Sequence, residues 1–153
     1  MSPIYEAAWS ELQNVYYAPR NFTKLCDTED VNPYSVRTVA CQSVCIRMTE
    51  ILVIGGLRIK TNIRGCMDNI LKGGFNKTVV TRHRWYQRDS CNQYQKRVLF
   101  QLPAERSDDS LISLCVCYND FCNGATSGSR REQLNLNILV ILYSIIVLML
   151  IYR

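Results

Sequence analysis

The sequence lacks several features that would assign it to a simple structural or chemical class. Its seven glycines follow no period, its apolar residues form no heptads, and its formal charge is only +5 over 153 residues. These absences exclude a collagen, a coiled coil and a wholly disordered chain. Histidine occurs once, as His83, and no serine or cysteine nucleophile can be assigned to it. Because the positive charge is spread along the chain, nucleic acid is a poor candidate partner. We therefore expect a non-enzymatic protein with no cofactor and no small-molecule substrate.

The opening segment also lacks the marks of a secretory leader. Met1 to Trp9 has no basic start, no continuous apolar stretch and no small residues before a cleavage point. One interpretation is that the protein enters membranes through its carboxyl-terminal tail alone. The other is that this form of the protein has lost its true amino end.

Cysteine, by contrast, is abundant. An even number in a short body indicates a disulfide framework made in an oxidising compartment. The competing interpretation is a zinc module, but the only histidine lies far from either close cysteine pair, so we expect no metal site. Two glycosylation sequons, at Asn21 and Asn76, also favour an extracellular body. The cysteines stand at 26, 41, 45, 66, 91, 115, 117 and 122.

The carboxyl end is apolar from Ile138 to Tyr152 and is followed by a single basic residue. As a helix this run would reach about 22 Å, short of the roughly 30 Å hydrocarbon core of a bilayer. Small residues, a polar spacer and an apolar end are typical of a signal that is exchanged for a glycosylphosphatidylinositol (GPI) anchor. We expect attachment at Ser127, Asn123 or Gly124, and a retained membrane span is the alternative. The expected parts are a domain over residues 1–123, a polar spacer over 124–137 and a hydrophobic segment over 138–153.

Local patterns predict two hairpins. Two β-rich runs between Cys45 and Cys66 flank Gly55 and Gly56, which suit a tight turn. A second hairpin is predicted with strands over 96–102 and 111–114, joined by a polar turn over 103–110. We expect both turns to face solvent as candidates for recognition.

One helical turn is predicted over 68–72, and a short helix over 6–14 within a broad aromatic loop. A basic and aromatic cluster over 81–88 could contact acidic lipids, glycans or a protein, or be a solvated strand face.

The end of the body, Cys115-Val116-Cys117-Tyr118-Asn119-Asp120-Phe121-Cys122-Asn123, resembles the closing signature of the lymphocyte-antigen-six/urokinase-receptor family of three-finger domains. The Cys41 and Cys45 pair and Arg64-Gly65-Cys66 match the same family. The segment from Tyr16 to Thr23, with Cys26 after it, is similar to the nematode odour-response branch. The resemblance implies a small disulfide-rich all-β three-finger domain that lacks its first strand here. It also implies a GPI-anchored cell-surface module on neurons that acts on a receptor or channel in odour response.

The resemblance further implies a disulfide pairing of Cys41 with Cys66, Cys91 with Cys115, and Cys117 with Cys122. Cys26 and Cys45 are then left over, and their family partners would lie upstream of Met1, so we expect this form to begin inside the domain. The alternative is that Cys26 and Cys45 pair with each other. Asp120 and Asn123 are expected to be structural, with Asn123 tying the closing loop to the base. The alternative function is a tail-anchored, single-span intracellular membrane protein whose thiols are free or bind metal.

Overall fold

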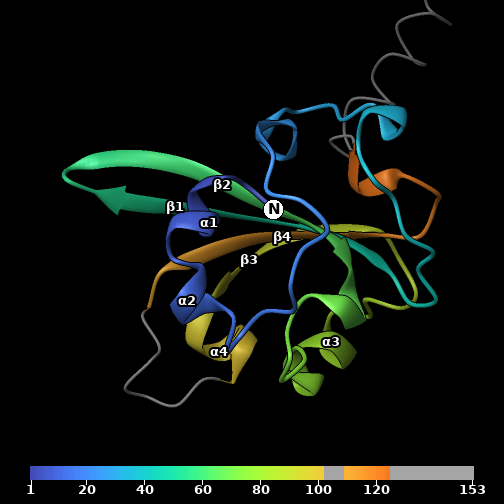
Figure 1. Ribbon diagram of the computed structural model, residues 1–153. Helices are drawn as coiled ribbons and strands as arrows, with labels where there is room; N and C mark the ends of the chain where they lie inside the picture. Colours follow the sequence, from blue (N-terminus) through green and yellow to red (C-terminus); the bar gives the residue numbers. More distant parts are fainter. Residues whose placement is uncertain (102–108, 125–153) are drawn as a thin grey trace, which may run out of the picture.

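The computed structural model describes residues 1–101 and 109–124. The strands of these residues form one antiparallel sheet in the order β2-β1-β4-β3 (Figure 1). Both neighbours of β1 pair with it antiparallel, and β3 pairs antiparallel with β4. The strands are β1 (Cys45–Ile54), β2 (Leu57–Cys66), β3 (Ser90–Gln95) and β4 (Leu111–Cys117).

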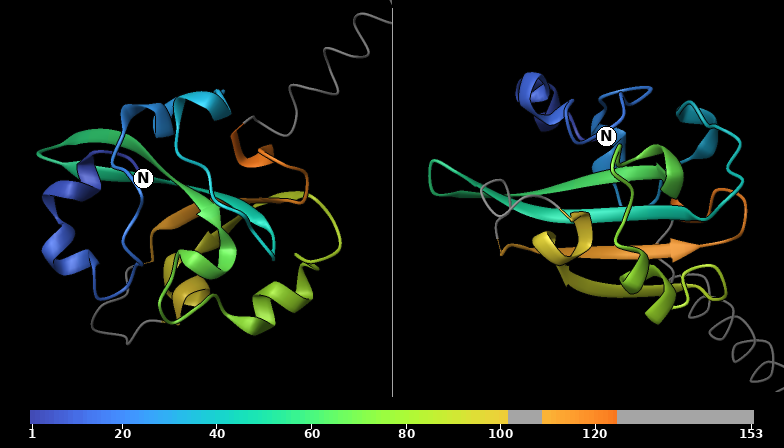
Figure 2. Two further views of the ribbon diagram at one scale, coloured as in Figure 1. Left: turned by 45° about the vertical axis from the view of Figure 1, so that its right-hand side comes forward. Right: turned by 90° about the horizontal axis from the view of Figure 1, so that it is seen from below.

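Short helices surround the sheet. Helices α2, α3 and α4 lie along one side, while the loop with the first two 3-10 turns lies on the other (Figures 1 and 2). None exceeds six residues among those described, so packing rather than helix propensity holds them. The α-helices are α1 (Ile4–Ala7), α2 (Trp9–Leu12), α3 (Lys77–Arg82) and α4 (Lys96–Phe100). The 3-10 turns are η1 (Lys24–Asp27), η2 (Pro33–Ser35), η3 (Met67–Asn69) and η5 (Cys122–Gly124).

The predicted hairpin between Cys45 and Cys66 is confirmed. Strands β1 and β2 pair along their whole length, from Cys45 opposite Cys66 to Ile54 opposite Leu57. The two residues of the turn, Gly55 and Gly56, have φ values of 57° and 81°. Such positive angles cost little for glycine and would strain a side chain-bearing residue. The local sequence therefore fixes both the turn and the register.

The second predicted hairpin is wrong in its first strand. Most of the run predicted as a strand over 96–102 forms α4. The hairpin partner of β4 is instead β3, the strand immediately before α4. Leu99 and Phe100 are adjacent and both buried, a pattern that one helical turn against the core allows and a half-exposed strand does not. Gln101, in the left-handed region at φ 53°, ends the helix. Most of the predicted turn lies outside the described residues.

The amino-terminal segment does more than form a loop. The helix predicted over 6–14 is present as two short pieces, α1 and α2, which meet at Ala8. Tyr5 and Tyr16 are buried, with 3% and 2% of their surface exposed. Tyr16 also forms a β-bridge with Leu71, just after η3, where a helical turn over 68–72 was predicted. The aromatic residues near the amino end therefore close one side of the core.

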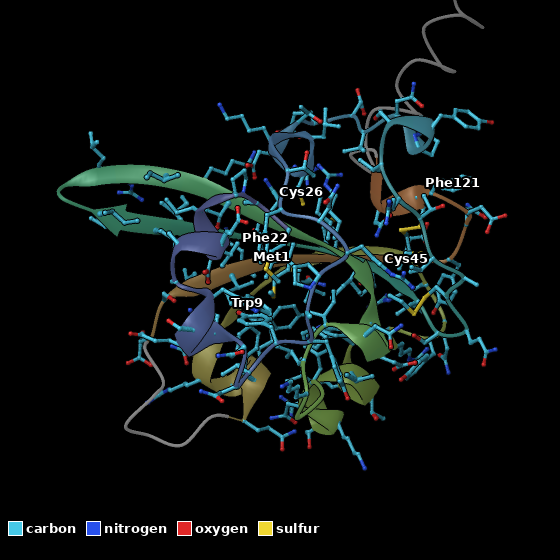
Figure 3. The ribbon with its side chains drawn as sticks, viewed as in Figure 1. Met1, Trp9, Phe22, Cys26, Cys45 and Phe121 are labelled. Atoms are coloured by element: carbon cyan, nitrogen blue, oxygen red, sulfur yellow. A yellow bond between two sulfur atoms is a disulfide. The ribbon has the colours of Figure 1, made fainter. Side chains whose placement is uncertain are left out.

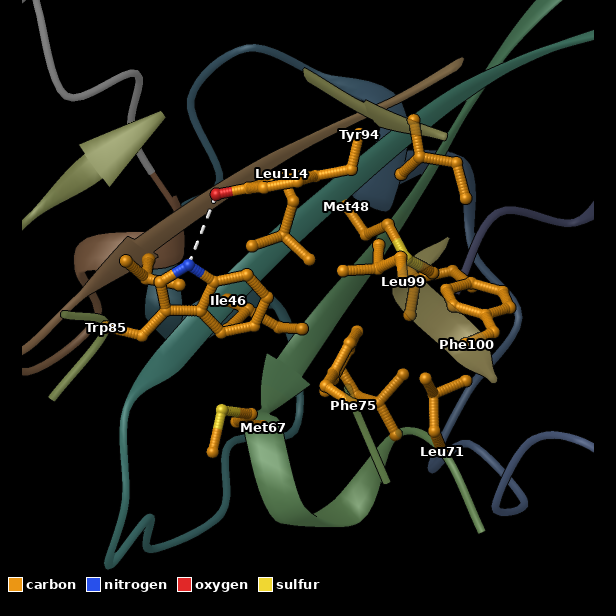
Figure 4. Close-up of a cluster of buried hydrophobic side chains, with 14 of the residues drawn as sticks. Ile46, Met48, Met67, Leu71, Phe75, Trp85, Tyr94, Leu99, Phe100 and Leu114 are labelled. Atoms are coloured by element: carbon orange, nitrogen blue, oxygen red, sulfur yellow. Dashed lines mark hydrogen bonds between the residues drawn. The ribbon is translucent and has the colours of Figure 1, made fainter. Parts of the chain in front are cut away.

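The core lies between the sheet and the helices (Figure 4). Trp85 is fully buried, and its indole Nε1 donates to the hydroxyl of Tyr94 at 3.2 Å. Phe75 meets the rings of Trp85 and Phe100 edge-on, with centroids 5.5 and 6.3 Å apart, an arrangement that aromatic pairs favour. This packing gives the sheet a rigid face from which one hairpin extends.

Candidate functional site: a disulfide base and a projecting hairpin

Three disulfides gather toward one end of the sheet, which we call the base. They join Cys41 to Cys66, Cys91 to Cys115 and Cys117 to Cys122, across sequence separations of 25, 24 and 5. These are the pairs that the family resemblance implies. Cys45 stands opposite both Cys66 and Cys117 in the two ladders, so the ends of β1, β2 and β4 meet there. A disulfide of this kind stabilises a small domain by about 2–4 kcal/mol.

The remaining two cysteines are free in the structure. Cys26, in η1, is buried and donates to the carbonyl of Asn62 at 3.2 Å. Cys45 begins β1 and is half-buried; burial raises the pKa of its thiol, and the negative charge of Asp120 raises it further. Figure 3 shows the two side chains apart. The alternative in which Cys26 pairs with Cys45 is therefore not formed here, because Cys26 lies against Asn62, which is opposite Thr49, four residues along β1 from Cys45.

Arg64 connects segments that are far apart in the sequence. Its Nε donates to the carbonyl of Cys26 at 3.0 Å, and its two terminal nitrogens donate to the carbonyls of Asn123 and Thr28. Burial lowers the pKa of this guanidinium, and the neighbouring positive charge of Arg47 lowers it further. Arg64 belongs to the family motif Arg64-Gly65-Cys66, but the sequence alone predicted no role for it. Its position just before Gly65-Cys66, at the end of the hairpin that closes the base, was the one feature of the sequence that could have indicated this role.

Asn123 ties the closing loop to the sheet. Its Nδ2 donates to the carbonyls of Ile46 in β1 and Gly65 in β2, at 3.2 and 3.3 Å. This is the role that the resemblance implies. Asp120 differs: it is exposed, and within residues 1–101 and 109–124 it makes no hydrogen bond. Asp120 acts electrostatically, because its negative charge adds to the effect of burial in raising the pKa of the Cys45 thiol.

The opposite end of the sheet carries an exposed apolar hairpin. Pairing of β1 with β4 ends at Glu50 opposite Ile112, whereas β1 and β2 continue alone to the Gly-Gly turn. Figure 1 shows this end projecting beyond the rest of the domain. Val53 and Leu57 expose 68% and 70% of their surface. Aliphatic side chains, which are usually buried in a folded domain, are therefore exposed to solvent at this end of the sheet.

A polar layer supports the root of this hairpin. Glu29 accepts from Lys60 at 2.8 Å and from Arg47 at 3.2 Å. These hydrogen bonds, first that of Lys60 and then that of Arg47, lower the pKa of the Glu29 carboxyl. On the core side Glu50 is buried, pairs with Lys96 at 3.2 Å and accepts from the hydroxyl of Tyr5 at 3.0 Å. Arg47 and Glu50 are buried charges that need such partners, so their contacts are structural.

The basic and aromatic cluster over 81–88 does not form a single surface. Trp85 enters the core, and the ring of His83 packs edge-on to Tyr94 with centroids 5.1 Å apart. Arg82, Arg84 and Tyr86 are exposed around them. The segment is the end of α3 and the turn that follows, so its interpretation as a strand face is wrong. Alternation of buried and exposed residues there reflects a tight turn.

The two sequons differ in their surroundings. Asn21 is exposed, and its side chain makes no hydrogen bond to any described residue. Asn76 caps α3: its Oδ1 accepts from the amide of Thr78 and its Nδ2 donates to the carbonyl of Val98, both at 2.9 Å. Asn21 is therefore the sequon with an open side chain in the folded domain.

The described part of the chain has neither a metal-binding cluster nor a membrane-spanning helix. It contains no group of three or more histidine, cysteine or acidic side chains placed to hold a metal ion. It also contains no helix with the length and apolar character needed to cross a bilayer. The candidate attachment residues Asn123 and Gly124 lie within this part, whereas Ser127 and the apolar end lie outside it.

These features define a small antiparallel β-sheet domain held by several disulfides, consistent with a three-finger module. A family model described as Caenorhabditis elegans ly-6-related protein matches residues 1–124. The chain therefore belongs to this Ly-6-related family. No curated protein matches the chain, and no solved structure does either. Membership of the family identifies it as a cell-surface or secreted module of signalling type.

Proposed function

We propose that this protein is a GPI-anchored, non-enzymatic module of the outer cell surface that modulates a receptor or channel. One observation carries the proposal: the closing loop and the projecting hairpin lie at opposite ends of the sheet. Asn123 is bonded to the base, and β1 runs from Cys45 at the base to Ile54 at the hairpin turn. A chain anchored just after the base would keep the domain at the membrane and leave its other surfaces available to a partner.

Among the candidate attachment residues we favour Ser127. Gly124 makes two main-chain hydrogen bonds. Its carbonyl accepts from the amide of Val31 at 2.8 Å, and its amide donates to the carbonyl of Phe121 at 2.9 Å. Cleavage after Asn123 would remove Gly124 and both bonds. Cleavage after Gly124 would place the lipid linkage against the packed loop. Attachment at Ser127 leaves the closing loop intact and keeps small residues at the two following positions.

The experiment is release from intact cells by phosphatidylinositol-specific phospholipase C. The full chain is expressed behind a cleavable secretory leader, so that export is not itself at issue. We expect release of the wild type and of Thr126→Leu, and little surface protein with Ser127→Leu. Retention of the wild type after phospholipase treatment would favour a spanning tail and overturn the anchor.

The native gene product, made without the added leader, tests the compartment through glycosylation. The proposal places a glycan on the open side chain of Asn21. Treatment with peptide N-glycosidase should increase the mobility of the wild type, and Asn21→Gln should abolish most of that shift. A chain without any glycan, carrying only free thiols, would instead support the tail-anchored intracellular alternative.

A role on neurons, in odour response, extends this proposal. It is supported by the similarity of the segment from Tyr16 to Thr23, with Cys26, to the nematode odour-response branch, and by the nematode family whose model the chain matches. Loss of the protein from chemosensory neurons should impair the behavioural response to some odours and leave locomotion intact. Normal chemotaxis to a broad odour panel would contradict this extension.

A further inference from the structure

The free end of the β1–β2 hairpin, residues 51–60, is an exposed apolar feature that the rest of the described fold does not cover. We call it the hairpin tip. Neither β4 nor α1 reaches it: β4 stops pairing at Glu50, and Tyr5 of α1 bonds to the Glu50 and Thr61 pair just below. Ile51, Val53, Ile54 and Leu57 expose 50%, 68%, 49% and 70% of their surface. Contiguous exposed aliphatic surface of this kind marks a site of interaction.

The register shows that the hairpin tip is apolar on both faces. Residues directly opposite in an antiparallel pair project to the same face. One face of the tip therefore carries only aliphatic side chains, in the pairs Leu52 with Ile59 and Ile54 with Leu57. The other face carries Ile51 opposite Lys60 and Val53 opposite Arg58. A groove of a folded partner that covered one face would leave the second face in water.

The charge of the hairpin tip has one sign. No carboxylate occurs between Ile51 and Lys60. Arg58 is exposed and forms no ion pair within the described part of the chain. Lys60 pairs with Glu29, but both side chains are more than half exposed, at 53% and 57%, so this pair exchanges readily with other anions. Long basic side chains beside an aliphatic end can reach acidic headgroups while the aliphatic atoms enter the hydrocarbon.

We propose that the hairpin tip inserts into the interface of the outer bilayer leaflet, with its aliphatic side chains among the acyl chains and Arg58 and Lys60 at the level of the lipid phosphates. Acyl chains can surround both faces at once, and the headgroups complement Arg58 and Lys60. The inference goes beyond the proposed anchor and depends on it only for bringing the domain to a membrane. With the anchor at the base and the tip in the lipid, the domain would lie along the bilayer, where a membrane-embedded receptor or channel would meet its side.

The experiment places a reporter at the tip of the full chain. Leu57→Trp, reconstituted with the intact carboxyl end, is compared with Tyr34→Trp, which adds the same ring at a residue 94% exposed in η2. Vesicles contain phosphatidylcholine alone or with 30% phosphatidylserine, with and without dibrominated acyl chains that quench tryptophan on contact. Against the wild type, whose Trp9 and Trp85 emit in every sample, we expect Leu57→Trp emission to shift to the blue and be quenched in both kinds of vesicle, and more strongly in the acidic one. Tyr34→Trp emission should change little.

Further variants separate the two contributions. Arg58→Gln in the Leu57→Trp chain should lower the equilibrium constant for insertion into acidic vesicles about fivefold, because one basic residue near an anionic surface contributes about that factor. Ile54→Asp in the same chain should lower the constant for insertion into both kinds of vesicle. We expect each variant to fold, because the tip contributes little to the core, and circular dichroism checks this.

Each other outcome overturns the proposal. Leu57→Trp emission that is unquenched in both vesicles, like that of Tyr34→Trp, would exclude lipid and leave a protein as the partner of the tip. A blue shift without lipid that grows with protein concentration would show that the tip binds a second copy of the chain. Because the reconstituted chain keeps its uncleaved end, these results are independent of phospholipase release, which tests the anchor.

Discussion

The guanidinium of Arg64, at the end of β2, donates to the main-chain carbonyl of Asn123, the residue that follows the last cysteine. Asn123 in turn donates through its side chain to the carbonyl of Gly65. The closing loop and the long hairpin are thus bonded to each other in both directions. Arg64 also reaches the carbonyls of Cys26 and Thr28, so one side chain joins the base to the amino-terminal loop.

Removal of this side chain should destabilise the domain markedly. Arg64→Met keeps most of the apolar stem but leaves three carbonyls without their charged donor, and we expect the free energy of unfolding to fall by about 2–4 kcal/mol. Urea denaturation monitored by tryptophan fluorescence measures it. Arg58→Met is the matched control, since Arg58 is exposed and unpaired in the described structure, and it should change stability by less than about 0.5 kcal/mol. Equal effects of the two substitutions would refute the role of Arg64.

The buried contact between Trp85 and Tyr94 supplies a second test. Tyr94→Phe removes the hydroxyl that accepts from the indole at 3.2 Å and leaves a fully buried donor without its partner. We expect a loss of about 1–2 kcal/mol in the free energy of unfolding, together with a change in Trp85 fluorescence. Tyr86→Phe, at an exposed tyrosine, is the control and should have little effect. A neutral Tyr94→Phe would mean that the indole nitrogen is satisfied in another way.

The ion pairs of Glu29 predict an acid-sensitive contribution to stability. Because its pKa is lower in the folded chain than its ordinary 4.5, the contribution is present above about pH 4.5 and is lost as the pH falls through the folded pKa. Glu29 is more than half exposed, so we expect only about 0.5 kcal/mol. Unfolding free energies of the wild type and Glu29→Gln should differ at pH 7 and converge near pH 3. A difference that persists at pH 3 would argue against ionic pairing.

The two free thiols should differ in reactivity. Cys45 is half-buried and Cys26 is buried and bonded, so a disulfide reagent at pH 8 should modify Cys45 first. Its raised pKa lowers the thiolate fraction, and Asp120→Asn should therefore speed the reaction of Cys45. Asp30→Asn, at another exposed carboxylate, should not. Faster modification of Cys26 than of Cys45 would show that η1 opens readily.

The sequence predicts the parts of this domain that depend on local chemistry. Gly55 and Gly56 specify the turn of the long hairpin, and the spacing of the cysteines specifies a cross-linked base once the family is recognised. The run that begins at Lys96 was predicted as a strand but forms a helix, because a short apolar run does not distinguish a strand from a buried helical turn. Arg64 and Tyr16 were missed for a different reason: their contacts join residues far apart in the chain, and only the folded base brings those residues together.

The most direct test of this account is peptide mapping, without reduction, of the full chain exported from cells, after free thiols are blocked. The account predicts three cross-linked pairs, Cys41 with Cys66, Cys91 with Cys115 and Cys117 with Cys122, as the structure has them, and blocking reagent on Cys26 and Cys45. Blocking reagent or bound metal on the other six cysteines in native material would contradict it.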